Sequence, residues 1–304
     1  MSNVVVAHDG PEKLAADVSS LEERSVHEYA QQQYEMQRQS PVSDWDKKRF
    51  NTDPAKWWNM FYKNNTANFF KDRKWLQQEF PILADITKAD AGPVTLLEIG
   101  AGAGNTAFPV LAQNQNPKLR LHACDFSKQA VKVMRDHEAY DTRHMQADVW
   151  DVAGETLPPD LGEASVDVAV MVFVFSALAP SQWARAVDNV YRVLKPGGLV
   201  CFRDYGRGDL AQVRFRKGRY LEENFYIRGD GTRVYFFDQE ELASIWSGEK
   251  VAAQVMQEGR KREENDETDE DKGERADEES QQPVDGPQAS PTPNRSRPHF
   301  ESEY

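Results

Sequence analysis

Apolar runs alternate with amphipathic segments through the middle of the chain. Short runs rich in apolar residues predict strands at 94–99, 119–124, 144–147, 166–174 and 199–202. Apolar residues at helical spacing predict helices at 106–113, 128–137 and 182–194. Strands and helices that alternate in this way form a mostly parallel sheet covered by helices on both faces, so we predict an α/β fold.

The two ends of the chain lack this alternation. Residues 1–40 are polar and predict a mobile N-terminal extension with one helix at 21–39. Residues 249–304 form an acidic tail that becomes rich in Gln, Pro and Ser, a composition that predicts disorder. The globular domain is therefore expected at 41–248, where a strand at 233–237 and a helix starting near Gln239 come last.

Composition excludes several classes of protein. The 304 residues are 39% hydrophobic, which is enough for a sizeable core. No apolar run approaches the roughly 18 residues of a membrane span, and no targeting pattern opens the chain. We therefore expect a cytoplasmic protein, with the nucleus as a second compartment. Cys124 and Cys201 lie in apolar runs, so we expect reduced core thiols and no metal site.

The net charge of −13 is concentrated near the ends of the chain. Residues 258–285 hold thirteen acids and five bases, and residues 1–40 hold seven acids and three bases. Between them, eight Lys or Arg residues fall within 47–74 and six within 203–219. Because RNA binding responds to local charge, the overall acidity does not exclude an RNA partner.

A glycine-rich turn follows the first predicted strand of the sheet. The string E-I-G-A-G-A-G runs from Glu98 to Gly104 and opens a helix, and glycines let a backbone approach a ligand closely. A dinucleotide site is one interpretation, because Gly102, Gly104 and Ala107 fit the loose form of that fingerprint. Glu98 and the phase of the three glycines favour S-adenosylmethionine instead.

Acidic residues end the next two predicted strands. Asp125 occupies the position where a carboxylate accepts hydrogen bonds from two ribose hydroxyls. Asp148 follows the third strand, at a position suited to the amino group of adenine. Together with the glycines, these residues predict a methyltransferase that uses S-adenosylmethionine.

Several longer strings resemble one family, the tRNA cytidine N3-methyltransferases that modify cytidine 32 in the anticodon loop. The specific strings are F-F-K-D-R at 69–73, R-D-Y-G at 203–206 and N-F-Y-x-R-x-D-G-T-R at 224–233. The resemblance covers about 57–246, and 207–215 is most similar to enzymes acting on threonine and serine tRNAs. It implies a Rossmann-like class I methyltransferase that forms 3-methylcytidine.

The resemblance also implies the residues that contact the cofactor. Carried over by position, they are Trp58, Tyr62, Gly100, Asp125, Asp148, Val149 and Val172, beside Glu98 and Gly102 of the glycine turn. Trp58 and Tyr62 are four residues apart, so on a helix they share a face that can close over the cofactor. Ordinary packing of these aromatics against the core is the alternative.

Aromatic and basic residues interleave between 47 and 80. Unpaired bases stack on aromatic rings while cations meet phosphates, so this segment is a candidate RNA-binding surface. A solvated basic helix on the core is the competing interpretation. The candidate RNA-binding residues are Lys71, Arg73 and Lys74 here, Arg207 further along, and Arg228 and Arg233 flanking a hairpin tip predicted at 224–233.

The chemistry of N3 methylation suggests where the catalytic residues lie. The N3 lone pair of cytosine is already nucleophilic, so the enzyme must supply a flipped base, alignment, and negative potential near the forming cation. Asp204 follows the fifth predicted strand and is our candidate for the amino edge of the base or for its positive charge. Arg203 and Tyr205 would shape the pocket, and an Arg203–Asp204 ion pair is the alternative.

The chain departs from the family pattern after the helix near Gln239. Members of the family continue with two further strands, so we expect the sheet to lack its final strands and to keep an open edge. A noncatalytic RNA-binding or partner-binding subunit is therefore the alternative function. The expected partners are the tRNA anticodon stem-loop and an accessory protein such as an aminoacyl-tRNA synthetase.

Overall fold

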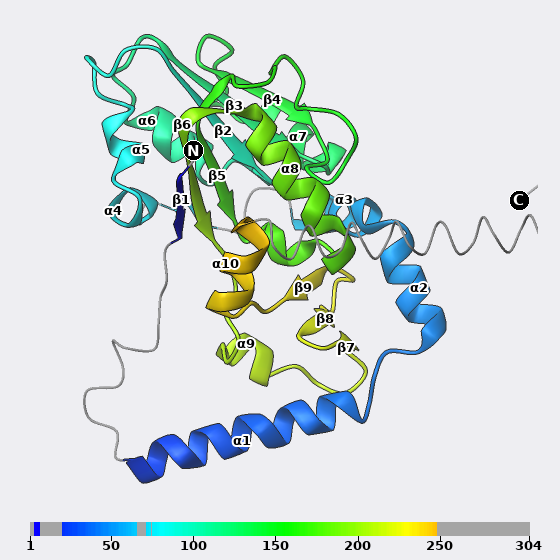
Figure 1. Ribbon diagram of the computed structural model, residues 1–304. Coiled ribbons are helices and arrows are strands. Elements are labelled where there is room, and N and C mark those ends of the chain that lie inside the picture. Colours follow the sequence, from blue (N-terminus) through cyan, green and yellow to red (C-terminus); the bar gives the residue numbers. More distant parts are fainter. Residues whose placement is uncertain (1–2, 7–19, 66–70, 74, 248–304) are drawn as a thin grey trace, which may run out of the picture. The chain divides into compact units, whose positions relative to one another are not determined.

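The computed structural model describes residues 3–6, 20–65, 71–73 and 75–247. Its centre is a six-stranded parallel sheet with the order β1-β6-β5-β2-β3-β4 (Figure 1). The strands are β1 (Asn3–Val6), β2 (Val94–Ile99), β3 (Leu119–Asp125), β4 (Met145–Val149), β5 (Val166–Val172) and β6 (Leu194–Arg203). The predicted α/β fold is confirmed, and the five predicted strands correspond to β2 through β6.

Helices cover both faces of this sheet because its strands are apolar on both sides. Leu97 and Met171 pack into a core with α8 (Trp183–Val193) and α10 (Gln239–Ser247). Leu96 and Val170 face the opposite core. The helices of that core are α4 (Leu76–Glu79), α5 (Ile82–Asp85), α6 (Ala107–Ala112) and α7 (Lys128–Arg135).

Both cysteines are buried free thiols inside the sheet, Cys124 in β3 and Cys201 in β6. This confirms the expectation of reduced core thiols. Residues 195–198 lie within β6, where pairing with β5 jumps from Leu194 to Leu199. The four intervening residues therefore form an irregularity in the strand, and Gly197 has a φ of +84° there.

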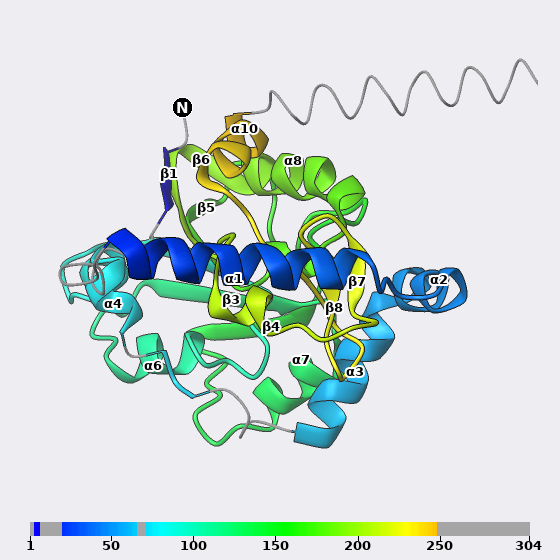
Figure 2. The same ribbon diagram turned by 90° about the horizontal axis from the view of Figure 1, so that it is seen from below.

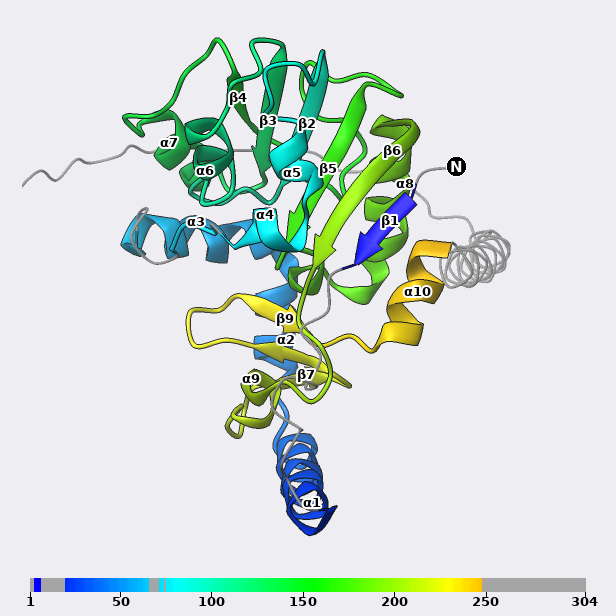
Figure 3. The same ribbon diagram turned by 90° about the vertical axis from the view of Figure 1, so that its left-hand side faces the viewer.

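The edge beside β6 differs from the expected open edge. β1 pairs in parallel with β6, with Asn3 opposite Leu199 and Val6 opposite Phe202 (Figure 3). From the sequence, these residues are predicted to belong to a mobile extension, because residues 1–40 as a whole are polar. Their backbone groups satisfy those of β6 along this stretch.

A second, antiparallel sheet lies below the carboxyl ends of the large sheet (Figures 1 and 3). It contains β7 (Tyr220–Glu222), β8 (Phe225–Ile227) and β9 (Arg233–Tyr235). β8 and β9 form the hairpin predicted at 224–233. α9 (Leu210–Val213) precedes this sheet, and no strand follows β9 in the described residues.

Helix α1 (Ser20–Arg38) crosses beneath the small sheet, as the view from below shows (Figure 2). Gln37 fixes its end: the side-chain amide donates to the carbonyls of Gln212 and Phe215 at 3.1 and 3.0 Å and accepts from the Tyr226 hydroxyl at 2.9 Å. α2 (Asp44–Thr52) and α3 (Pro54–Asn65) then lead back to the large sheet. No helix in the described ranges is long and apolar enough to cross a membrane.

Candidate functional site

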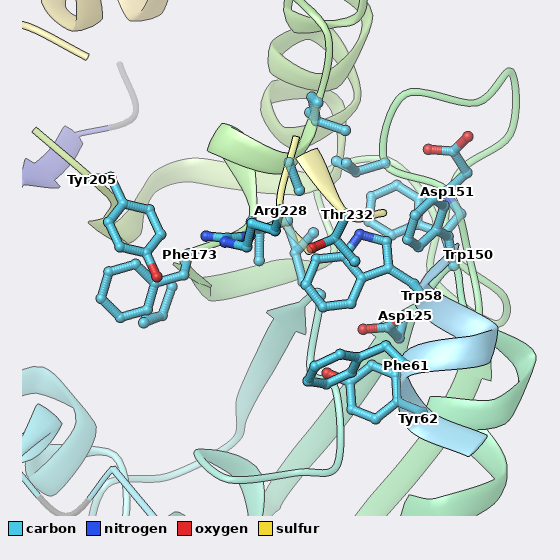
Figure 4. Close-up of a pocket in the computed structure, with 18 of the residues that line it drawn as sticks. Trp58, Phe61, Tyr62, Asp125, Trp150, Asp151, Phe173, Tyr205, Arg228 and Thr232 are labelled. Atoms are coloured by element: carbon cyan, nitrogen blue, oxygen red, sulfur yellow. The ribbon is translucent and has the colours of Figure 1, made fainter. Parts of the chain in front are cut away.

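A cavity opens at the carboxyl ends of β2, β3 and β5, between the large sheet and the β8–β9 hairpin (Figure 4). Asp125 and the ring of Trp58 lie at one end, and Phe173 and Tyr205 lie at the other. The carboxyl edge of a parallel sheet is the usual ligand site in α/β folds. The cavity therefore occupies the position that the glycine turn and Asp125 predict.

The glycine turn passes so close to its neighbours that side chains would not fit. Gly100 and Gly102 have φ values of +64° and +58°. A Cβ on Gly102 would lie 2.3 Å from the Tyr62 hydroxyl oxygen, and one on Gly100 would lie 2.3 Å from a methyl of Val174. Positive φ requires glycine at both positions, together with the contact of Gly102 with α3 and of Gly100 with Val174.

Asp125 holds the turn through its buried carboxylate. Its Oδ2 accepts a 2.9 Å hydrogen bond from the backbone N–H of Gly102, and its Oδ1 accepts one of 2.8 Å from Ser127. Burial raises the pKa of Asp125 to about 6. Each carboxylate oxygen has a second lone pair, so Asp125 can still accept hydrogen bonds from ribose hydroxyls.

Helix α3 supplies an aromatic wall to the cavity. Trp58, Phe61 and Tyr62 line it, and the rings of Trp58 and Tyr62 stack with centroids 6.1 Å apart. Asn59 anchors the helix because its Oδ1 accepts hydrogen bonds from the Ser127 hydroxyl at 2.9 Å and the Gln129 N–H at 3.1 Å. Trp58 and Tyr62 therefore lie on the cavity, as their spacing predicts.

Glu98 lies beneath the turn and is almost completely buried, with 2% of its surface exposed. Its Oε2 accepts a 2.9 Å hydrogen bond from the Ala107 N–H, and its Oε1 has no hydrogen-bond partner. Burial raises the pKa of Glu98 to about 7, while the Arg73 guanidinium opposes this rise. These residues fit S-adenosylmethionine. The glycines allow close approach of a ligand, the Asp125 carboxylate can bind the ribose, and α3 supplies an aromatic wall. Glu98 has a buried oxygen without a hydrogen-bond partner beside the Arg73 cation.

Four of the expected cofactor residues are not among those lining the cavity: Glu98 beneath the glycine turn, Gly102 within it, and Asp148 and Val149. Asp148 accepts hydrogen bonds of 2.7 Å from both Arg135 and Gln146, and Val149 is 42% exposed. Trp150 and Asp151, which follow them in the chain, do line the cavity, and so does Val172 as expected. The sequence does not indicate this shift, because which loop residues turn inward depends on the path of the chain after β4.

Of the three expected catalytic residues, Tyr205 is the one among those lining the cavity, at its other end, whereas Arg203 and Asp204 are not. The ring of Tyr205 lies 4.7 Å from that of Phe173. Phe173 has a φ of +58°, an unusual conformation for a bulky residue that occurs mostly where the surrounding structure imposes it.

Asp204 supports this end of the cavity from behind. Its carboxylate accepts hydrogen bonds from the backbone N–H groups of Ser176 at 2.8 Å and Tyr205 at 2.9 Å. Desolvation raises the pKa of Asp204 to about 6. Arg203 forms an ion pair with Glu79, and the Arg203 guanidinium lies 4.7 Å from the ring centre of Trp75.

The expected RNA-binding residues occupy several different environments. Lys71 is exposed, and Lys74 lies outside the described residues. Arg207 forms ion pairs with Asp238 and Glu241. Arg73 lines the cavity instead of the outer surface.

The two hairpin arginines differ most from each other. Arg228 lines the cavity, and its guanidinium lies 5.3 Å from the ring centre of Tyr205. Arg233 is only 4% exposed and donates hydrogen bonds to the carbonyl of Ala177 and to the side chains of Asn51 and Gln182. Arg233 therefore joins the hairpin to the neighbouring elements, a role that its flanking position does not reveal.

Comparison with known proteins agrees with this site. The methyltransferase domain family matches residues 97–200, and it supports S-adenosylmethionine as the cofactor. A solved structure, the DhpI-SAM-HEP complex, aligns with a TM-score of 0.44 at 17% identity, covering 64% of this chain and 85% of that one.

Curated relatives are much more similar in sequence. The tRNA(Thr) (cytosine(32)-N(3))-methyltransferase of Saccharomyces cerevisiae is 55% identical over 72% of this chain and 35% of its own length. A tRNA N(3)-methylcytidine methyltransferase of Schizosaccharomyces pombe is 49% identical over 70% of this chain and 68% of its own. A human tRNA N(3)-cytidine methyltransferase is 40% identical over 68% of this chain and 72% of its own length.

The matched region thus spans about a third of the budding-yeast relative and about two thirds of the fission-yeast relative. These matches cover about 70% of this chain, more than the methyltransferase domain family does at 97–200. The chain belongs to the family of tRNA N3-cytidine methyltransferases.

Proposed function

We propose that this protein methylates N3 of cytidine 32 in the anticodon loop of threonine or serine tRNAs, using S-adenosylmethionine. The observation that carries the proposal is one continuous cavity that joins the Asp125 site to an aromatic and cationic end at Phe173, Tyr205 and Arg228. Cytosine N3 as the target follows from both yeast relatives, and position 32 of threonine tRNA follows from the budding-yeast relative.

The described residues suit a reaction that needs alignment more than acid–base chemistry. When bound, S-adenosylmethionine supplies an electrophilic methyl group. The N3 lone pair of cytosine can attack without prior loss of a proton, whereas N3 of uracil carries a hydrogen. The protein must therefore hold a flipped cytosine and stabilise the positive charge that develops on it.

Phe173 and Tyr205 are our candidates for the surface on which the flipped base rests. Enzymes that extrude a base stack it on aromatic side chains, and this contact offsets part of the free energy that unpairing the base costs. Asp204 fixes Tyr205 through the backbone and adds negative potential behind it, while Arg228 places a cation over the Tyr205 ring. In this arrangement Asp204 acts chiefly by positioning Tyr205 and by its charge.

The proposed RNA surface includes α2, next to the cavity wall formed by α3. Trp45 is 69% exposed, and the Arg49 guanidinium lies 5.4 Å from its ring centre and 5.1 Å from that of Trp57. Exposed aromatic rings backed by cations are typical of surfaces that stack unpaired bases. The tRNA anticodon stem-loop as substrate, an aminoacyl-tRNA synthetase as accessory protein, and a cytoplasmic or nuclear location belong to this proposal.

Nucleoside mass spectrometry tests the function directly. Purified protein would be incubated with S-adenosylmethionine and unmodified threonine tRNA carrying either C32 or U32, with and without seryl- or threonyl-tRNA synthetase. We expect 3-methylcytidine only from the C32 transcript. Cofactor binding and tRNA binding without any methyl transfer, under all of these conditions, would contradict the proposal and favour a noncatalytic role.

A further inference from the structure

Arg73 lies in an environment unlike that of an RNA-binding cation. Its side chain is 14% exposed, and it lines the cavity on the side of the glycine turn. The backbone N–H of Arg73 donates a 2.9 Å hydrogen bond to the carbonyl of Asn105, which fixes the residue to the end of that turn. Lys71, two residues earlier, is exposed.

The Arg73 guanidinium is held by groups of the turn and of the strand beneath it. Its Nη1 donates to the Thr106 hydroxyl at 3.2 Å and lies 3.8 Å from Oε1 of Glu98. That carboxylate oxygen is the one without a hydrogen-bond partner. The separation is long for a hydrogen bond, so the two groups attract each other without a direct bond.

A guanidinium has five N–H donors, so contacts with Thr106 and Glu98 leave donors for a ligand. Because it lies inside the cavity, an RNA phosphate on the outer surface would not be its natural partner. The ligand proposed for this cavity carries one negatively charged group, the α-carboxylate of its methionine part. Arginine pairs with carboxylates through two parallel hydrogen bonds.

The position of Arg73 along the cavity agrees with this assignment. Asp125 defines the ribose end of the proposed ligand, and Trp58 and Tyr62 flank it. In the turn from Gly102 to Thr106, Gly102 at the start is bonded to Asp125, and Asn105 and Thr106 at the end are bonded to Arg73. An adenosyl ligand with its ribose at Asp125 can therefore extend its amino-acid chain along the turn toward Arg73.

We propose that Arg73 positions the cofactor by binding the α-carboxylate of S-adenosylmethionine, with Glu98 and Thr106 holding the guanidinium in place. This inference rests on the proposed use of S-adenosylmethionine and assigns a new role to a residue of the basic segment. Arg73 then serves the cofactor, while exposed Lys71 in the same string faces solvent. Arg73 and Lys71 therefore have different roles although they are only two residues apart.

Two ligands that differ only in the amino-acid part test the assignment by calorimetry. S-adenosylhomocysteine carries the α-carboxylate, and 5′-methylthioadenosine lacks the whole amino-acid group. For Arg73→Ala we expect about a 10- to 100-fold loss of affinity for S-adenosylhomocysteine, the size of a charge-assisted pair. Affinity for 5′-methylthioadenosine should stay within about twofold of wild type.

Matched variants separate this effect from general damage. Arg73→Lys keeps the charge but loses the paired geometry, so its loss for S-adenosylhomocysteine should be intermediate. Lys71→Ala should leave both affinities unchanged. Each variant is compared with wild type by thermal melting before calorimetry.

Three results would overturn the assignment. Unchanged affinity of Arg73→Ala for S-adenosylhomocysteine would exclude the contact. An equal loss for both ligands would show that Arg73 acts by supporting the turn. Failure of the wild-type protein to bind either ligand would overturn the proposed cofactor as well, which distinguishes that failure from the first two.

Discussion

The backbone N–H of Gly102 donates a 2.9 Å hydrogen bond to Oδ2 of Asp125. This bond joins the turn after β2 to the carboxyl end of the neighbouring strand β3. It uses one oxygen of a carboxylate that also faces the cavity, so the same side chain shapes the turn and is available to a ligand. Cofactor binding and the geometry of the glycine turn should therefore depend on Asp125 together.

Replacing Asp125 tests this dependence. Asp125→Ala removes the acceptor proposed for the ribose hydroxyls and should lower affinity for S-adenosylhomocysteine at least about 100-fold, because two hydrogen bonds to a charged group are lost. Isothermal calorimetry measures the change. Asp136→Ala, at an exposed carboxylate that pairs with Lys132, is the control and should bind normally. Normal affinity in a folded Asp125→Ala variant would remove Asp125 from the site.

The raised pKa of Glu98 predicts a pH dependence of stability. Burial raises its pKa to about 7, so the folded state binds more protons than the unfolded state from about pH 4.5 to 7. The free energy of unfolding should therefore fall as the pH rises through this window. The raised pKa values of Asp125 and Asp204, each about 6, act in the same direction.

Glu98→Gln tests the contribution of this one carboxyl group. The variant cannot ionise at this position, so its melting temperature should fall less between pH 5 and pH 7.5 than that of the wild type. Differential scanning calorimetry of the ligand-free protein measures both profiles. Glu163→Gln, at an exposed glutamate that pairs with Arg192, should retain the wild-type profile. Parallel profiles for Glu98→Gln and wild type would contradict the prediction.

The two hairpin arginines should respond differently to substitution. Arg233→Ala removes a hydrogen-bond donor from the carbonyl of Ala177 and from the side chains of Asn51 and Gln182, so we expect it to destabilise the fold by about 2–4 kcal/mol. Arg228→Ala should leave stability within about 1 kcal/mol of wild type and lower methylation of C32 tRNA at least tenfold. Chemical denaturation and turnover assays distinguish the pair. Similar denaturation midpoints for the two variants would contradict this division.

Gln37 should control the attachment of α1 to the small sheet. Gln37→Ala removes one donor and one acceptor from a site that is 2% exposed, leaving the Tyr226 hydroxyl and the carbonyls of Gln212 and Phe215 without it. We expect a loss of about 1–3 kcal/mol and faster hydrogen exchange along α1. Gln39→Ala, at an exposed position on the same segment, should change neither quantity.

The sequence alone determines most of the large sheet. Apolar runs locate β2 and β5 to within two residues, because strands buried on both faces are mostly apolar. The glycines and Asp125 also locate the cofactor end of the site from the sequence. Backbone geometry allows few other residues at the turn, and the end of β3 places the acid beside it.

The tertiary structure alone decides what each polar side chain meets. Arg73, Arg228 and Arg233 look alike in the sequence, yet one faces the glycine turn, one lies over Tyr205 and one is buried beneath the hairpin. The sequence likewise does not predict the strand β1 or the position of Asp151 in the cavity lining. The spacing of apolar residues predicts which positions are buried, because each helix or strand buries one side of its own local sequence. A charged group acquires its role from partners that are distant in sequence, so its role is fixed only when the chain has folded.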